Sequence, residues 1–406
     1  MRICLVVSIL VCCLCVAAGA KCPVGDVNGD CRVSYRDLLL LAEQWLGDPN
    51  GAANLNGDAH IDGADLAILT DRWGKVGCPI VINELLAHSH DVEPDWIELY
   101  NLSSVPVDLG GWTLSDDEND LGKYRIGAGT IVGPNDYLLL YEDQHFGNPN
   151  DPNVTSPFKM SENGEILYLY SGQDEAFPGC LVVERFGASD TGTSFGRYLK
   201  STGTYNFVPM SVLTPGAANA YPLVGPIVIN EIMYRPANDG DAEYVELLNV
   251  SNGPVTLFDF DALEPWRFTD DAGIEFAFPA AMPLTVQAGQ HILLARDRSL
   301  VRQMFGVQAH IPIYEWDSGR LANSGEKLRL LKPGDVDEAG TRYWIEADRV
   351  NYSDGSHGES FDDGVDPWPR EADGYGMSLN RLSPLRYGND PNNWQATIPT
   401  PGSPND

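Results

Sequence analysis

Along most of the chain, apolar and polar residues alternate over four to eight positions, and Gly, Pro, Asn and Asp separate these runs. This pattern predicts short, half-buried antiparallel strands, and a succession of them indicates β-sandwiches. The region before residue 79 is different, because apolar residues there follow a helical spacing over 38–46 and 66–73. We therefore expect a mostly β protein in which two sandwiches follow a small all-α module.

A long internal duplication supports two β domains. The hexapeptide PIVINE at 79–84 recurs at 226–231, and WIELYN at 96–101 is matched by YVELLN at 244–249. Both copies close with Thr-Pro-Gly, at 214–216 and 400–402. We assign the first sandwich to 79–219 and the second to 226–406, with a linker at 220–225.

A shorter duplication, with an offset of 28 residues, lies in the helical region. Oxygen-bearing residues occupy positions 1, 3, 5, 7, 9 and 12 of two twelve-residue loops, with position 7 offering its backbone carbonyl. They are Asp26, Asn28, Asp30, Arg32, Ser34 and Asp37 in the first loop, and Asn54, Asn56, Asp58, His60, Asp62 and Asp65 in the second. Six oxygens around one short loop suit Ca²⁺, so the sequence predicts two calcium ions.

Differences between the loops lead to two further expectations. Asn54 stands where the first loop has Asp26, and the lost negative charge predicts weaker binding in the second loop. Val33 and Ile61, both at position 8, are expected to join the two loops by a short β bridge.

Residues 22–78 resemble a type I dockerin, a small calcium-dependent module that attaches secreted proteins to cohesin domains. The resemblance rests on the doubled pattern of Asp and Asn oxygens, each followed by one apolar helix. It departs at position 6, where Cys31 and Ala59 replace the Gly usual in an EF-hand, and at position 12, which is Asp in both loops. The family's partner-selecting positions 10 and 11 are Tyr35 and Arg36 in the first loop, which implies a cohesin-like partner there.

The two β copies resemble the lamin-tail domain, an immunoglobulin-like sandwich. The resemblance rests on the order of the INE, WIEL, Trp-containing and closing Thr-Pro-Gly segments. It implies a non-catalytic module with binding or spacing roles, and it provides no catalytic residues.

Residues 1–20 have the layout of a cleaved secretory signal, with Arg2, an apolar run, and small residues before a cleavage site near Ala20. The first module then spans 21–78, and the mature chain is expected to be extracellular or at the cell surface, without a membrane span. The even count of Cys22, Cys31, Cys78 and Cys180 predicts two disulfides, with three connectivities open. A zinc site is disfavoured because these cysteines contain no Cys-x-x-Cys pair.

The charge of the chain limits which classes of partner are expected. Lys and Arg number 26 against 58 Asp and Glu, a formal net charge of −32. Such a charge repels phosphate backbones and anionic lipids, so nucleic acid is not expected as a partner. A cohesin-like domain, and beyond it an extracellular polysaccharide or cell-surface component, fit better.

Several other residues are of types that can carry chemistry. Glu84 and Glu98, with their counterparts Glu231 and Glu246, are paired carboxylates that we interpret as structural acceptors of backbone N–H groups. The His88-Ser89-His90 segment is expected to be solvated instead of holding a metal. The acidic turns at 115–120 and 270–271 are expected to be solvated as well, with further calcium binding as the alternative.

Four tryptophans raise the question of a sugar-binding platform, although core packing is favoured for them. They are Trp316, Trp344, Trp368 and Trp394.

Together these features predict a secreted, non-catalytic modular protein that docks through a calcium-dependent module. One alternative is an extracellular hydrolase of polysaccharide or phosphodiester with its site in the second sandwich. A carboxylate cluster in a cleft found only there would favour it. Another alternative is a structural cell-surface protein whose calcium module serves as a stiffened cap.

Overall fold

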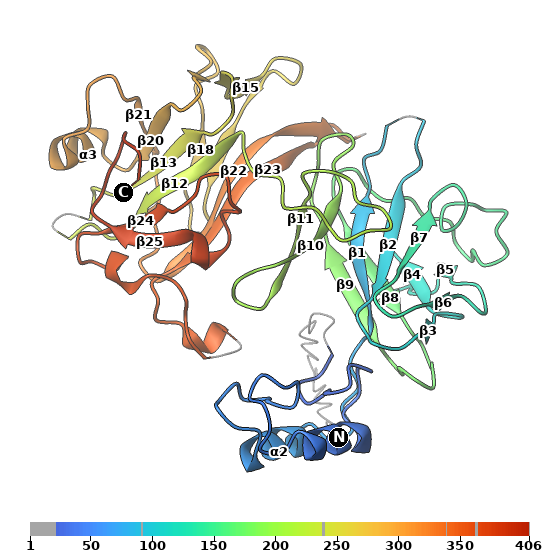
Figure 1. The fold of residues 1–406 in the computed structure, drawn as a ribbon. Helices are drawn as coiled ribbons and strands as arrows, with labels where there is room; N and C mark the ends of the chain where they lie inside the picture. The colour runs from blue at the N-terminus through green and yellow to red at the C-terminus, as the bar shows by residue number, and fades with distance from the viewer. Residues whose placement is uncertain (1–21, 91, 238–239, 338, 362–363, 406) are drawn as a thin grey trace, which may run out of the picture. The chain divides into compact units, whose positions relative to one another are not determined.

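The computed structural model describes residues 22–90, 92–237, 240–337, 339–361 and 364–405. The fold is mostly β, with a small helical module followed by immunoglobulin-like sandwiches, as the sequence predicts. Figure 1 labels the helices and strands along the chain, which divides into two compact units. The first comprises the described residues up to Ile82, together with Tyr100–Tyr137 and Leu167–Val183; the second comprises Asn83–Leu99, Leu138–Ile166 and the described residues from Glu184 onward.

Two short helices form the N-terminal module, α1 (Tyr35–Glu43) and α2 (Gly63–Asp71). Each begins three residues before the apolar run that predicts it, because a capping box nucleates the first turn. Leu41, Leu69, Val33, Ile61 and Ala53 are buried together between them. Such a small core supplies little stability, and domains of this size usually depend on disulfides or metal ions as well.

The first β copy contains eleven strands. They are β1 (Ile80–Leu86), β2 (Trp96–Asn101), β3 (Val107–Asp108), β4 (Thr113–Ser115), β5 (Tyr124–Arg125), β6 (Ile131–Val132), β7 (Tyr137–Tyr141), β8 (Ile166–Tyr170), β9 (Leu181–Arg185), β10 (Phe195–Leu199) and β11 (Tyr205–Pro209). Its sheets have the orders β11-β10-β1-β2-β7, β5-β4-β8-β9 and β3-β6.

The second copy repeats this plan with insertions. Its elements are β12 (Ile227–Met233), β13 (Tyr244–Asn249), β14 (Val255–Thr256), β15 (Phe258–Asp259), β16 (Glu264–Pro265), β17 (Arg267–Thr269), β18 (Glu275–Ala277), β19 (Thr285–Val286), β20 (His291–Ala295), α3 (Arg298–Phe305), β21 (Ile313–Glu315), β22 (Gly325–Val336), β23 (Arg342–Ser353), η1 (Gly358–Ser360), η2 (Arg370–Ala372), β24 (Ser378–Arg381), η3 (Pro391–Asn393) and β25 (Trp394–Thr397). The main sheets run β21-β20-β13-β12-β24-β25 and β18-β17-β22-β23.

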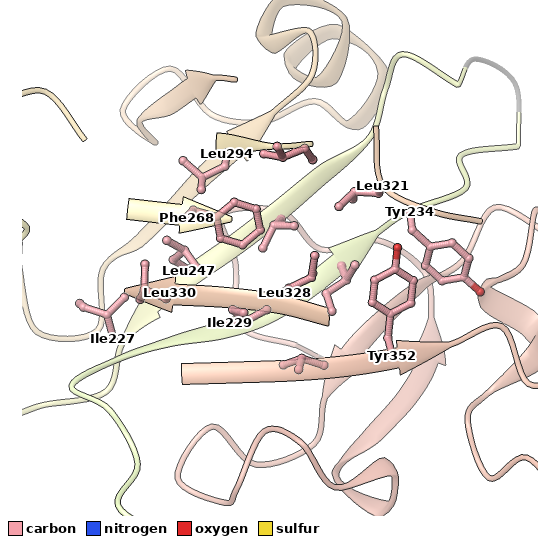
Figure 2. Close-up of a cluster of buried hydrophobic side chains, with 14 of the residues drawn as sticks. Ile227, Ile229, Tyr234, Leu247, Phe268, Leu294, Leu321, Leu328, Leu330 and Tyr352 are labelled. Carbon is pink, nitrogen blue, oxygen red and sulfur yellow. The ribbon is translucent and has the colours of Figure 1, made fainter. Parts of the chain in front are cut away.

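The core of the second sandwich lies between its two main sheets (Figure 2). Ile229 and Leu247 from one sheet are buried in the same cluster as Phe268, Leu328 and Leu330 from the other. The helix α3, which the sequence analysis did not predict, packs on the other face of the sheet that contains β12, β13 and β20. A helix forms there because Asp297 caps its first turn and Gly306 ends it in the left-handed region, with φ of 66°.

Two disulfides form among the described residues, as the cysteine count predicts. They join Cys22 to Cys31 and Cys78 to Cys180, so the alternative pairing of Cys22 with Cys78 does not occur. The second bond closes a loop with a sequence separation of 102 residues, whereas the first spans nine.

We expect the two disulfides to contribute unequally to stability, because loop-closure entropy grows with loop length. Cys78→Ser/Cys180→Ser should cost about 5 kcal/mol and Cys22→Ser/Cys31→Ser about 2.5 kcal/mol. Guanidinium unfolding of both double variants would measure the difference. An equal loss in the two variants would contradict the entropic argument.

Candidate calcium loops and buried carboxylates

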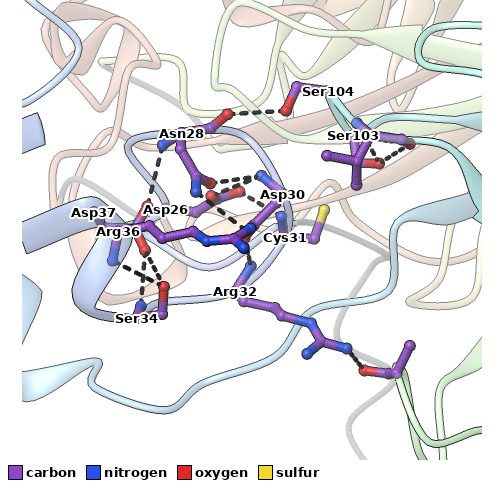
Figure 3. A network of polar contacts seen from close by, with 12 residues as sticks. Asp26, Asn28, Asp30, Cys31, Arg32, Ser34, Arg36, Asp37, Ser103 and Ser104 are labelled. Carbon is purple, nitrogen blue, oxygen red and sulfur yellow. Dashed lines mark hydrogen bonds and ion pairs between the residues drawn. The ribbon is translucent and has the colours of Figure 1, made fainter.

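The first predicted calcium loop curls around its own side-chain oxygens (Figure 3). Asp26 accepts hydrogen bonds from the backbone N–H groups of Asp30 (3.0 Å) and Cys31 (2.8 Å). Asn28 Oδ1 accepts from Asp30 N at 2.9 Å, and Asp30 Oδ1 accepts from Arg32 N at 3.1 Å. The structure therefore brings the side chains of positions 1, 3 and 5 together inside one turn.

The last two ligand positions also start the helix. Ser34, at position 9, is the N-cap of α1, and Asp37, at position 12, is the third residue of the capping box. The Asp37 carboxylate is fully buried and accepts from the backbone N–H groups of Val27 (2.8 Å), Asn28 (3.1 Å) and Ser34 (2.7 Å). Position 12 therefore links both ends of the loop to the helix.

The second loop repeats the backbone hydrogen bonds of positions 3, 5 and 12. Asp65 is buried and accepts from Leu55 N (2.7 Å), Asn56 N (3.2 Å) and Asp62 N (2.8 Å). Burial opposes ionisation, but these three backbone donors lower the pKa of Asp65 below its usual value. Asp58 Oδ1 accepts from His60 N at 2.7 Å, as Asp30 does from Arg32.

Position 1 distinguishes the two loops. The amide nitrogen of Asn54 donates to the carbonyls of Pro49 (2.6 Å) and Asp58 (2.8 Å), so this side chain offers one oxygen where Asp26 offers two. In the first loop, burial and the charges of Asp30 and Asp37 raise the pKa of Asp26 to about 6. The loops therefore differ in the negative charge with which they would meet a cation.

The expected β bridge between Val33 and Ile61 is wrong. Val33 N donates to Lys75 O at 3.0 Å, and Ile61 O accepts from Leu46 N at 2.9 Å. Each position-8 residue thus pairs with the segment that follows the other loop's helix. Each loop is followed by only one helix. The segment that leaves this helix lies beside position 8 of the other loop and takes the backbone hydrogen bond that the β bridge would have used.

The donor set of both loops suits a hard cation, because every candidate ligand atom is a carboxylate, amide, hydroxyl or carbonyl oxygen. Among the described residues, Cys22, Asp26 and Cys31 form the one close trio of ligand-type side chains. Its two sulfurs are joined in a disulfide, so the trio is not a thiolate metal site.

Tyr35 and Arg36 lie on the outer surface of α1. The Tyr35 side chain is 62% exposed, and the Arg36 guanidinium lies 3.9 Å from Asp30. Leu39, one turn further along α1, is 56% exposed. The corresponding positions of α2 carry Gly63 and Ala67, so the exposed apolar surface belongs to the first helix.

In the first sandwich, two buried glutamates hold the closing Thr-Pro-Gly segment. Glu84 accepts from Thr214 N (3.2 Å) and Thr214 Oγ1 (2.5 Å), and Glu98 accepts from Gly216 N (2.5 Å). Burial raises the pKa of Glu98 to about 7, although the Gly216 and Asn83 donors oppose this. The expectation that these glutamates accept backbone N–H groups is confirmed.

The second sandwich repeats the arrangement. Glu231 accepts from Thr400 N at 3.0 Å, and Glu246 accepts from Gly402 N at 2.6 Å. Burial first, and the charge of Glu246 second, raise the pKa of Glu231 to about 7. All four glutamates are fully buried and each accepts hydrogen bonds from the fold, which is the arrangement of structural groups and not of exposed acids and bases.

Sequence reasoning missed four residues of these clusters. Ser194 donates to Glu84 at 2.6 Å, and Ser378 donates to Glu231 at 2.5 Å. Asn219 and Asn405, three residues after each Thr-Pro-Gly glycine, donate to the carbonyls of Asn83 and Asn230, both at 3.0 Å. A signal was available, since both copies read Thr-Pro-Gly-x-x-Asn.

The expected solvation of the histidine segment is wrong for His88. Its Nδ1 lies 2.9 Å from Ser189 O and its Nε2 lies 2.9 Å from Thr191 Oγ1, because the turn at 189–191 folds over the ring. His90 is exposed. The two rings therefore have different surroundings and do not form a matched pair of ligands.

The acidic turns are also more ordered than expected. Asp116 forms an ion pair with Lys123 at 2.5 Å, with both side chains mostly buried. Asp270 is 7% exposed and accepts from the backbone N–H groups of Ala272, Gly273 and Ile274. Both carboxylates shape their own turns.

Three of the four tryptophans are core residues, so the favoured prediction of core packing is confirmed for them. Trp316, Trp368 and Trp394 are at most 4% exposed and belong to the central cluster of the second sandwich. Trp344 is half-buried, and the Arg267 guanidinium covers its ring at 3.9 Å from the centroid. The rings of Trp316, Trp368 and Trp394 are therefore used for packing between the sheets.

A cleft with carboxylates lies in the part of the second copy that has no counterpart in the first. It is lined by Asp354, Ser356, Arg370, Glu371, Asp373 and Tyr375. Asp373 pairs with Arg235, and Asp354 accepts from Ser356 N at 2.9 Å. The Tyr375 side chain is 79% exposed.

Comparison with known proteins agrees with this architecture. Residues 75–179 and 222–352, more than half of the chain, match the family described as Lamin Tail Domain, and residues 24–72 match the Dockerin type I domain. No curated protein matches the chain. The match to a crystal structure of a DUF4876 family protein from Bacteroides thetaiotaomicron covers 54% of this chain and 85% of that chain, at 12% identity and a TM-score of 0.26. In the described part of the chain, no helix is long and apolar enough to cross a membrane.

Glu231 yields a test of the buried clusters. Its Oε1 accepts all three donors, from Tyr244, Ser378 and Thr400, while Oε2 has no partner. The raised pKa means that the folded protein holds a proton there between about pH 4.5 and 7. This contribution to stability is fully present below pH 4.5 and is lost as the pH rises through 7.

Glu231→Gln should therefore stay within about 1 kcal/mol of the parent at neutral pH and flatten the pH dependence, whereas Glu231→Ala should cost about 3 kcal/mol. Thermal unfolding from pH 4.5 to 8 measures both effects. A parent protein that becomes more stable across this range, with an unchanged slope in the Gln variant, would refute the assignment.

Proposed function

Because the chain belongs to the lamin tail domain family and carries a dockerin type I module before its two copies, we propose that it is a secreted, non-catalytic modular protein. Dockerin modules generally bind calcium, imply a cohesin partner and are typical of extracellular proteins. Dockerin and lamin-tail domains are both non-catalytic types of module. The proposed role is calcium-dependent docking of a chain that carries two sandwiches for binding or display.

The observation that carries this proposal is that the two oxygen-lined loops repeat the same backbone hydrogen bonds at positions 3, 5 and 12. Two calcium ions are proposed, one for each loop, held by the residues at positions 1, 3, 5, 7, 9 and 12. The repulsion among Asp26, Asp30 and Asp37 favours a divalent cation, and binding it would stabilise a module whose apolar core is small.

The proposed docking surface is the outer face of α1. Tyr35 and Leu39 are four residues apart, so they share one helix face, and Arg36 adds a cation beside them. An exposed aromatic with a neighbouring Arg is the composition of an interface hot spot. The matching face of α2 lacks these side chains, which supports a single orientation of the partner.

Secretion remains part of the proposal. The predicted signal at 1–20 and its cleavage near Ala20 lie outside the described residues, which begin at 22. The two disulfides support an oxidising compartment, because such bonds persist mainly outside the cytosol.

An extracellular hydrolase is the second candidate, and one observation favours it. The cleft around Asp354, Glu371 and Asp373 lies in the second copy, and carboxylates in a cleft are the groups that acid–base hydrolysis uses. A cleft of the first copy is also lined by carboxylates, among them Asp95, Glu142 and Glu162, so this feature does not distinguish the two copies. Against it, Asp373 is already paired with Arg235.

Calcium titration of the full oxidised chain tests the main proposal. We expect two ions, and we expect Asp30→Ala and Asp58→Ala, at the same position of the two loops, each to remove one of them. Capture on immobilised type I cohesins should require calcium and be reversed by chelator. Tyr35→Ala should weaken capture by about tenfold or more, with Ala67→Ser on α2 as the neutral control.

Two results would contradict docking. Absence of calcium binding would remove the calcium proposal altogether. Binding of two ions without capture by any cohesin would favour the structural cell-surface alternative.

The hydrolase candidate predicts release of reducing sugars or phosphate from polysaccharide or phosphodiester substrates, and loss of that activity in Asp354→Asn. The control is Asp136→Asn, which changes an exposed carboxylate of the first copy that lies outside that cleft. No activity above the Asp354→Asn background would exclude the candidate.

A further inference from the structure

We propose that the first calcium loop is seated on the first β copy, and that Ser104 and the Arg32 side chain are positioning residues for its ion. This inference rests on the proposed calcium binding and extends it to residues outside the loop. All of the groups involved belong to the first compact unit.

Ser104 lies in the turn between β2 and β3 and holds two consecutive carbonyls of the loop. Its Oγ donates to Asn28 O at 2.9 Å (Figure 3), and its backbone N–H donates to Gly29 O at 2.7 Å. These are loop positions 3 and 4. The two bonds fix the peptide planes next to the Asn28 side chain, which supplies a ligand oxygen.

Gly29 shows how close this approach is. Its φ of 76° lies in the left-handed region, and a Cβ at this position would lie 3.3 Å from both Cβ and Oγ of Ser104. The equivalent Gly57 of the second loop, with φ of 72°, has nothing within 4 Å of such an atom. The first loop therefore contacts the β copy at Gly29, whereas the second loop has no neighbour at the equivalent Gly57.

Arg32 makes the next contact. Its carbonyl is the candidate ligand at position 7, while its guanidinium lies 5.0 Å from the centroid of the Phe177 ring and donates to Ala176 O. That segment is itself held in place, because Ser171 Oγ donates to Phe177 O at 2.6 Å and Cys180 is bonded to Cys78. The counterpart in the second loop, His60, is exposed.

By thermodynamic linkage, these contacts can change the affinity of the first loop for calcium. If they favour the loop shape that binds calcium, calcium must favour the contacts by the same factor. Loss of a net hydrogen bond or a cation–π contact is worth roughly a fivefold change each. The first loop should therefore lose affinity when Ser104 or Arg32 is truncated, although neither change removes a proposed ligand atom.

The experiment uses the full oxidised chain. Calcium affinities of the two loops are measured in the parent, in Ser104→Ala, in Arg32→Ala and in the matched control His60→Ala. We expect about a fivefold loss at the first loop for each of the first two variants, and no change at either loop for His60→Ala. Hydrogen exchange of the Ser104 amide is followed in parallel, with and without calcium.

We expect calcium to slow exchange at Ser104 by about tenfold in the parent and in Asp58→Ala, but not in Asp30→Ala. Two bound ions together with unchanged Ser104 exchange and unchanged affinities would overturn this inference and leave the calcium proposal standing. A parent chain that binds no calcium would overturn both.

Discussion

A buried carboxylate must find hydrogen-bond donors, and the architecture of both β copies depends on this requirement. Glu84, Glu98, Glu231 and Glu246 are all fully buried, so leaving any of them unpaired would cost several kcal/mol. In each copy the donors include backbone N–H groups of the closing Thr-Pro-Gly segment. The end of each domain is thereby tied to its first two strands, and the same interaction explains why these distant motifs are duplicated together.

The calcium loops meet the same requirement in a different way. Asp37 and Asp65 are buried and are satisfied by three backbone N–H groups each, which also start the two helices. The remaining carboxylates of each loop lie close together with fewer donors, and the proposed divalent cation would offset their repulsion. The residues of each helix cap also belong to the proposed ion site, so binding of the ion would be coupled to folding of the module.

The duplications differ where function is expected to differ. In the helical module, the first repeat carries Tyr35 and Leu39 on its surface and contacts the β copy through Ser104, while the second repeat has neither feature. In the β copies, the second adds α3 and the cleft around Asp354. Both duplications thus preserve the buried polar scaffold and vary the surface, as expected when scaffold changes are costly and surface changes are not.

The sequence alone determined the mostly β class, the two duplications, the loop positions and the structural nature of the four glutamates, because these follow from local spacing and periodicity. Tertiary structure decided the pairing of Cys78 with Cys180, the partners of Val33 and Ile61, and the burial of Trp368 and Trp394. It also brought Asn219 and Asn405 to the carboxylate clusters. Each of these depends on which segments meet across more than ten residues of chain. The repeated Thr-Pro-Gly-x-x-Asn marks Asn219 and Asn405 as a pair, but it does not encode which groups they contact.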